Sequence, residues 1–206
     1  MGRNLAHFTE GLSAVFRKMA AALKPGSPLA FTYHHNQLDA YLPVAVAILD
    51  AALVCSGSIP CPAEMGASIH INGTGSSIMD TVFICRSTGL YPRRWLASNP
   101  KELAAVIQAD LDLLARGNVE ATKGDIKCIA SGHLIRLAIW NLRNQWEPGA
   151  PTDSRIRSVR GWIQKFGGID AVLEELGSSF DGANRLQLWV AMEESPKRRG
   201  RDEIPF

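Results

Sequence analysis

One stretch, residues 23–36, constrains the fold of this chain more than any other. Lys24 suits the C-terminus of a helix, and the Pro-Gly pair that follows it ends a helix and turns the chain. The apolar and aromatic run at residues 29–33 then predicts a short strand that is covered on both faces. Polarity returns at once with three residues, His34, His35 and Asn36. Because open α/β sheets bind ligands just outside the carboxyl ends of their strands, this rim is the first candidate site.

Helical spacing of apolar residues predicts an amphipathic helix before this strand. Its expected buried face is Phe8, Leu12, Val15, Phe16, Met19 and Leu23. Residues 37–49 predict a second helix, in which Pro43 indicates a kink or a late start.

Further strands are predicted after the second helix. Residues 51–59 predict a short strand that ends in a rigid Pro-Cys-Pro turn at residues 60–62, and residues 67–71 a small extended piece. Residues 78–86 are rich in Val, Ile, Phe and Thr, which favours a strand. A helix between two strands predicts a parallel crossover, and the later pair, joined without a helix, would be antiparallel.

The second half of the chain is predicted to be helical after a basic and aromatic link at residues 91–95. Asn99 as N-cap and Pro100 at the first position open a helix that Gly117 ends. Thr122 or Asp125 opens the next helix. Its expected buried face is Ile126, Ile129, His133, Leu137, Trp140 and Leu142, with His133 interpreted as a hydrogen-bonded core histidine. Shorter helices are expected around residues 155–165, 169–176 and 183–192.

Composition excludes several classes of function. The 206 residues carry a net charge of +2, so any binding of nucleic acid must come from local patches. The four cysteines form no Cys-x-x-Cys pair, which argues against a zinc ribbon and favours reduced, mostly buried thiols in a cytoplasmic protein. No apolar run approaches the ~20 residues of a membrane span, and the N-terminus lacks the apolar core of a signal peptide. We therefore expect a cytoplasmic location and no membrane partner.

Several pieces of the first 90 residues resemble the carboxyl half of a class I S-adenosylmethionine-dependent methyltransferase. The resemblance is closest to the adenine-specific DNA methylases that often carry a zinc ribbon. The pieces are Leu-Lys-Pro-Gly (23–26), Phe-Thr-Tyr-His-His-Asn (31–36), Pro-Cys-Pro-Ala-Glu (60–64), Ser-Ile-His-Ile-Asn-Gly-Thr-Gly-Ser-Ser (68–77) and Val-Phe-Ile-Cys-Arg (82–86). Lys-Pro-Gly occurs across the superfamily, whereas the second and fourth pieces together are much more specific.

The resemblance implies an α/β fold: the last strands of a Rossmann-like methyltransferase sheet, five to seven, followed by an all-helical extension. The sheet part would take residues 1–90, the helical extension residues 91–196, and a charged, disordered tail residues 197–206. It also implies a part of an adenine-specific DNA methyltransferase, whose target base leaves the duplex stack to reach S-adenosylmethionine.

The glycine-rich cofactor loop and the Asp-Pro-Pro-Tyr motif of such enzymes do not occur in this sequence. We therefore assign no catalytic residue, leave the cofactor-binding residues open, and expect the chain alone to be inactive. It is expected to be a fragment, a split half or a relic. Its expected partners are DNA and a second polypeptide or missing amino-terminal half, with self-association as the alternative.

The candidate substrate-binding residues are the polar residues at the expected carboxyl edge. They are Tyr33, His34, His35 and Asn36 after the first strand, and Ser68, His70, Asn72, Gly73, Thr74 and Ser76 in the following loop. The histidines equally fit ordinary capping of the next helix, and the Gly-Thr-Gly loop fits either a phosphate cradle or a simple turn. No metal site is expected, because no carboxylate or cysteine lies at ligand spacing beside the histidines.

Two other functions stay open. One is a non-catalytic DNA-binding or partner-binding module derived from such an enzyme. The other is half of a different nucleotide-binding Rossmann-like enzyme, against which the Tyr-His-His-Asn and Gly-Thr-Gly pieces argue. The aromatic and basic link at residues 91–95 fits a nucleic-acid contact or a solvated hinge.

Overall fold

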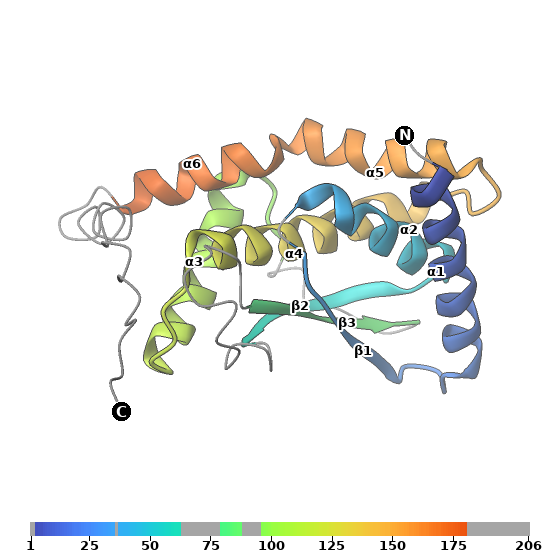
Figure 1. Cartoon of the computed structure of the whole chain (residues 1–206), viewed down its shortest axis with the longest axis horizontal. Helices are drawn as coiled ribbons and strands as arrows, with labels where there is room; N and C mark the ends of the chain where they lie inside the picture. Colours follow the sequence, from blue (N-terminus) through green and yellow to red (C-terminus); the bar gives the residue numbers. More distant parts are fainter. Residues whose placement is uncertain (1–2, 36, 63–78, 88–95, 181–206) are drawn as a thin grey trace, which may run out of the picture.

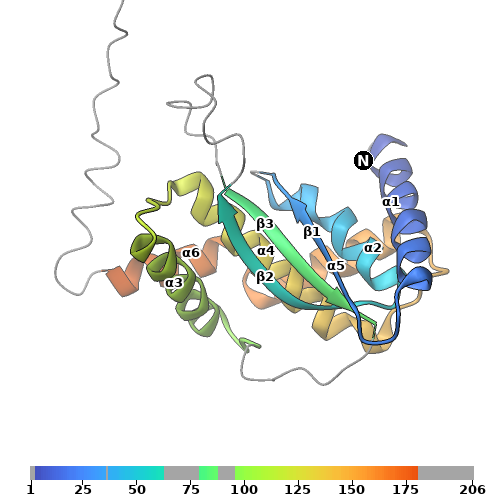
Figure 2. The same cartoon turned by 90° about the horizontal axis from the view of Figure 1, so that it is seen from below.

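The structure is a computed structural model, and it describes residues 3–35, 37–62, 79–87 and 96–180. These residues form a mixed α/β fold in which a three-stranded sheet carries helices on one face, with α1 and α3 beside it (Figures 1 and 2). The order is α1 (Arg3–Ala22), β1 (Pro28–Tyr33), the 3-10 helix η1 (Leu38–Tyr41), α2 (Leu42–Asp50), β2 (Val54–Pro62) and β3 (Met79–Arg86). Four α-helices follow: α3 (Pro100–Arg116), α4 (Lys123–Leu142), α5 (Thr152–Phe166) and α6 (Gly168–Phe180).

The sheet has the order β1-β3-β2, and β3 is antiparallel to both neighbours. The predicted antiparallel pairing of the last two strands is therefore confirmed. β1 and β2 run in the same direction, as the crossover through α2 requires, but they are not neighbours because β3 lies between them. The connection fixes the direction of a strand, whereas its place in the sheet depends on which strand it pairs with.

The prediction that β1 is covered on both faces is wrong. Along β1 the residues alternate between exposed and half-buried. Leu29, Phe31 and Tyr33 pack against the core, whereas Ala30 and Thr32 are exposed. β1 is an edge strand, and α2, α4 and α5 lie on one face of the sheet (Figure 1), which leaves Ala30 and Thr32 exposed on the other.

The predicted turn at residues 60–62 is also wrong, because these residues belong to β2. They pair with Thr81, Asp80 and Met79 of β3. β2 lies at the other edge of the sheet, where proline is tolerated because its missing N–H is not needed by a second neighbour. A bulge interrupts the pairing of β2 between Cys55 and Gly57.

The predicted buried face of α1 needs correction. Phe16 is buried and meets Phe31 of β1 edge-to-face, with ring centroids 5.0 Å apart. However, Phe8, Val15 and Met19 are 48%, 50% and 44% exposed. The polar residues Thr9 and Ser13 are buried in their place. Thr9 can be buried because its hydroxyl donates a hydrogen bond to the Leu5 carbonyl at 2.7 Å.

A partly buried ionic network links α1 to α2 and α5. Arg155 of α5 donates hydrogen bonds to Asp50 at the end of α2 and to Glu10 of α1. The indole N–H of Trp146 donates to the same Asp50 at 2.9 Å. Burying a charge is costly unless it is paired, so these contacts hold the Glu10 side of α1 toward α5.

The local signals in the helices are largely confirmed. The Asn99 side chain caps α3 by accepting a hydrogen bond from the Glu102 amide at 3.0 Å, and α3 ends at Gly117. Thr122 and Asp125 form a capping box at the start of α4. Pro43 occupies the first turn of α2, which confirms a late helix start.

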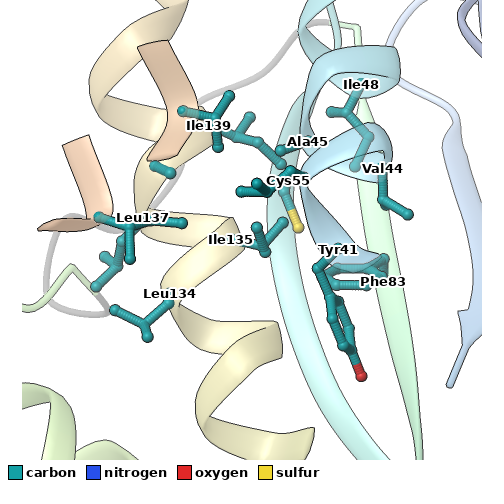
Figure 3. Close-up of a cluster of buried hydrophobic side chains, with 14 of the residues drawn as sticks. Tyr41, Val44, Ala45, Ile48, Cys55, Phe83, Leu134, Ile135, Leu137 and Ile139 are labelled. Carbon is teal, nitrogen blue, oxygen red and sulfur yellow. The ribbon is translucent and has the colours of Figure 1, made fainter. Parts of the chain in front are cut away.

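Helix α4 is buried on nearly all sides and joins the helices to the sheet. It packs against β2 and β3, and its residues share one core with α2 and the strands (Figure 3). The prediction that Trp140 is buried is wrong: it is half-buried near the end of α4, with the Arg143 guanidinium 3.6 Å above its ring. The predicted elements at residues 67–71 and 183–192, the link at 91–95 and the tail at 197–206 lie outside the described residues.

Candidate functional site

The candidate site is the end of the sheet at which β1 and β2 finish and β3 starts. Tyr33, the last residue of β1, pairs with Thr81, and Pro62, the last of β2, pairs with Met79. The two parallel strands therefore place their carboxyl ends at the same end of the sheet. His34 and His35 follow β1 there, and we call this pair the histidine rim.

His34 is held by the start of β3. Its Nδ1 lies 2.9 Å from the Met79 carbonyl oxygen and 3.5 Å from Asp80 Oδ1. A carbonyl oxygen only accepts hydrogen bonds, so Nδ1 carries the proton of the neutral ring. Within the described part of the chain, the lone pair of Nε2 accepts no hydrogen bond. The side chain is partly open to solvent, and His34 therefore offers a hydrogen-bond acceptor at the rim.

His35 has the opposite arrangement. Its Nδ1 accepts a hydrogen bond from the backbone N–H of Gln37 at 3.0 Å, so the neutral ring carries its proton on Nε2. The His35 carbonyl in turn accepts a hydrogen bond from the thiol of Cys128 in α4 at 3.2 Å. The imidazole is exposed, and His35 offers a hydrogen-bond donor at the rim.

Tyr33, the residue before the rim, is anchored to η1. Its hydroxyl donates a hydrogen bond to the Ala40 carbonyl at 2.8 Å, and its ring meets Tyr41 edge-to-face at 4.9 Å. Burial raises the pKa of Tyr33, so its hydroxyl stays protonated. Behind it, burial also raises the pKa of Tyr41, whose hydroxyl lies near Thr81 and Cys128. The Tyr33 hydroxyl is therefore engaged in a hydrogen bond within the fold.

Asp80 is the residue at this end of the sheet that sequence reasoning missed. It lies in β3, it is half-buried, and its carboxylate Oδ1 lies 3.5 Å from His34 Nδ1. A charged residue inside an otherwise apolar strand, Met-Asp-Thr-Val-Phe, is the signal that identifies it.

The remaining predicted site residues cannot be placed. Asn36, Ser68, His70, Asn72, Gly73, Thr74 and Ser76 lie outside the described residues. Pro62 and Met79, the described residues on either side of positions 63–78, both lie at the histidine-rim edge. That residues 34–36 and 68–76 lie close together stays a prediction.

His133 lies in the core, as predicted. Its Nε2 lies 2.7 Å from Asp110 Oδ2, and its side chain is almost fully buried. In the described part of the chain, no group of three His, Cys, Asp or Glu side chains is placed to hold a metal ion. No helix among the described residues is long and apolar enough to cross a membrane.

A shallow hollow of about 250 Å³ lies at the opposite end of the sheet from the histidine rim. Its lining comes from the start of β2 and the segment after α4, and includes Leu53, Val54, Arg143 and Trp146. Val54 pairs with Arg86, the last residue of β3, so this hollow lies at the end of the sheet away from the rim. It therefore does not contribute to the rim.

Comparison with family models, with curated proteins and with solved structures finds no match to this chain. The site's own geometry is thus the basis for a functional proposal, together with the sequence resemblance.

Proposed function

We propose that this chain is part of an S-adenosylmethionine-dependent, adenine-specific DNA methyltransferase that works in the cytoplasm. The strand order carries the proposal. In the class I methyltransferases that the sequence resembles, the seventh strand lies antiparallel between the fifth and the sixth, at the end of an otherwise parallel sheet. β1, β2 and β3 have this order and these directions, and α2 is the crossover between β1 and β2. This arrangement supports assigning them to strands five, six and seven.

The histidine rim supports the same proposal. It lies at the carboxyl ends of the parallel strands, where open α/β sheets bind their ligands. His34 offers an acceptor at Nε2 and His35 offers a donor. An adenine edge carries an exocyclic N–H donor beside a ring-nitrogen acceptor, so a base extruded from DNA can pair with this rim.

The described residues do not fit S-adenosylmethionine. β1, assigned to strand five, is followed by His34, His35 and a 3-10 helix, and the sequence contains neither the glycine-rich loop that follows the first strand of such enzymes nor an Asp-Pro-Pro-Tyr motif. We therefore assign the cofactor loop and the Asp-Pro-Pro-Tyr motif to a partner, either a second polypeptide or an amino-terminal half. The rim residues would then bind and orient the base, and the partner would supply the methyl donor.

The outer edge of β1 is the expected contact with that partner. Among the described residues β1 pairs with β3 alone, so its other edge has no strand beside it. An open strand edge readily pairs with another chain. Helix α1 lies on the same side (Figure 2), and it exposes the apolar side chains of Phe8, Val15 and Met19. In the resembled enzymes strand four occupies this edge.

Reconstitution tests the proposal. The full chain is co-expressed with the amino-terminal half of a methyltransferase of the resembled group, which carries the glycine-rich loop and Asp-Pro-Pro-Tyr. Transfer of labelled methyl groups to adenine in duplex DNA is then measured. We expect His34→Ala and His35→Ala each to slow transfer about ten- to a hundredfold, the loss of one strong hydrogen bond. His7→Ala, an exposed histidine on α1, is the matched control and should leave transfer unchanged.

Three outcomes would contradict the proposal or part of it. Micromolar binding of S-adenosylmethionine by the chain alone, in titration calorimetry, would contradict the strand assignment. Full transfer in both rim variants would reduce the rim to a turn between β1 and η1. DNA binding by the chain without transfer, with any such partner, would favour the non-catalytic binding module.

A further inference from the structure

Two cysteines face each other across β2 and β3. Cys55 and Cys85 are register partners in this antiparallel pair, and both are free. They are 3% and 0% exposed, on the side of the sheet that α4 covers (Figure 3 shows Cys55). Directly opposite residues of antiparallel strands have Cα atoms ~4.5–5.5 Å apart, which lies within the ~4.4–6.8 Å found in disulfides.

The side chains of Cys55 and Cys85 also interact with each other. The thiols of Cys55 and Cys85 are hydrogen-bonded, and this contact, together with burial, raises the pKa of Cys85. The Cys55 thiol also lies 3.1 Å from the Gly57 carbonyl oxygen. The bulge that follows Cys55 loosens the pairing of β2 next to the cysteine, so a small adjustment can bring the sulfurs to bonding distance.

The other two cysteines lack this arrangement. Cys61 is exposed, and its partner across the strands is Asp80. Cys128 is buried in α4, and its thiol donates to the His35 carbonyl. A buried thiol by itself behaves as a small apolar side chain. Opposite placement and sulfur contact together distinguish Cys55 and Cys85 from that ordinary role.

We propose that Cys55 and Cys85 are a redox modification site, which a small-molecule disulfide such as oxidised glutathione converts into a disulfide that ties β2 to β3. One protein thiolate attacks a sulfur of the reagent, forms a mixed disulfide and expels the first thiolate. The second cysteine then attacks the protein sulfur of the mixed disulfide and expels the second thiolate. The protein loses two protons and two electrons, and the reagent is reduced to two thiols.

Access to the buried pair comes from the position of β2. It is an edge strand, and edge segments open locally at a lower free energy than the rest of a core. The new bond closes a loop between residues 55 and 85, which constrains the unfolded chain and stabilises the folded one.

The experiment uses the full chain with Cys61→Ser and Cys128→Ser, so that Cys55 and Cys85 are the remaining thiols. After incubation with oxidised glutathione under folding conditions, we expect an intact mass lower by two hydrogen atoms. Digestion should yield one peptide pair linked through residues 55 and 85. The thermal midpoint should rise by about 5 °C or more and return on reduction. Adding Cys85→Ala is the matched control, which should stop at a mixed disulfide or stay reduced.

Two results would overturn the proposal. One is that both thiols are still reduced, and can be alkylated, after incubation with oxidised glutathione, or that the reaction stops at glutathione adducts. The other comes from the unsubstituted chain, whose mapping does not depend on the folding of any variant. Oxidation that links Cys55 or Cys85 to Cys61 or Cys128 would contradict the pair, whereas a 55–85 link supports it.

Discussion

His133 shows how the surroundings of one residue fix its protonation. Its Nε2 donates to the Asp110 carboxylate at 2.7 Å, so the proton of the neutral ring is on that nitrogen. Nδ1 is buried and has no hydrogen-bond partner among the described residues. A second proton there would be buried without an acceptor. Burial accordingly lowers the pKa of His133, although the hydrogen bond to Asp110 acts in the opposite direction.

The lowered pKa of His133 predicts a loss of stability in acid. Below the ordinary pKa of ~6.5, His133 is protonated in the unfolded chain but stays neutral in the folded chain. Its contribution is therefore complete above pH ~6.5 and is lost as the pH falls below it. His133→Gln should cost about 1–3 kcal/mol at pH 7.5, through the lost hydrogen bond, and the gap should narrow at pH 5.5. Denaturant unfolding at both pH values measures it.

The exposed His7 provides the control for this prediction. His7→Gln should follow the wild-type stability at both pH values. A His133→Gln gap that is equal at the two pH values, or wider in acid, would show that folding does not lower the pKa of His133.

Helix α4 is the element that joins the helices to the sheet, and a glycine permits its close approach. A Cβ atom at Gly132 would lie 2.6 Å from Ser58 Oγ and 2.7 Å from Thr81 Cγ2. Both of these side chains are buried under the helix. The space between α4 and the two strands is therefore filled, and a methyl group there requires the helix or the strands to move.

Gly132→Ala should lower the free energy of unfolding by about 1–3 kcal/mol, because overpacking outweighs the ~1 kcal/mol by which alanine favours a helix. Gly161→Ala in α5 is the matched control. Nothing lies within 4 Å of a Cβ at Gly161, so this variant should gain up to about 1 kcal/mol. Chemical denaturation of both variants decides the matter. Equal gains would mean that α4 is not packed closely on the sheet.

At the scale of the whole molecule, one side of the fold is left open in the described part of the chain. β1 ends the sheet without a neighbour on its outer edge, and α1, which lies on that side of the sheet (Figure 2), exposes apolar side chains. Arg155 holds α1 in this position through Glu10. The hydrogen bond from Thr152 and the charge of Arg155 outweigh desolvation and lower the pKa of Glu10, so this anchor weakens only in acid.

The open side predicts self-association in the absence of a partner. We expect light scattering to show dimers or larger species that increase with concentration. Val15→Glu, on the exposed apolar face, should shift the chain toward monomer. Ala14→Glu, at an exposed position beside Val15, should have a much smaller effect. A monodisperse, cooperatively unfolding wild-type monomer would contradict the open side as a contact surface.

Local signals in the sequence determined much of this fold. The Asn99 and Thr122 caps, the late start of α2 at Pro43 and the antiparallel β2-β3 pair follow from short-range chemistry, and the structure has them. The sequence also marked His34 and His35 by the abrupt change from an apolar strand to polar residues. Such features depend on neighbours within a few positions, so they can be predicted without the fold.

Only the tertiary structure decided the rest. The insertion of β3 between β1 and β2 depends on long-range pairing, and it made β1 an edge strand that is not covered on both faces. The rotation of α1 followed the pairing of Glu10 with Arg155, distant in sequence, and overrode the apolar periodicity that favoured burying Phe8. The proton positions on His34 and His35 likewise depend on Met79 and Gln37. A buried charge or an imidazole takes its state from its spatial neighbours, and periodicity in the sequence does not contain them.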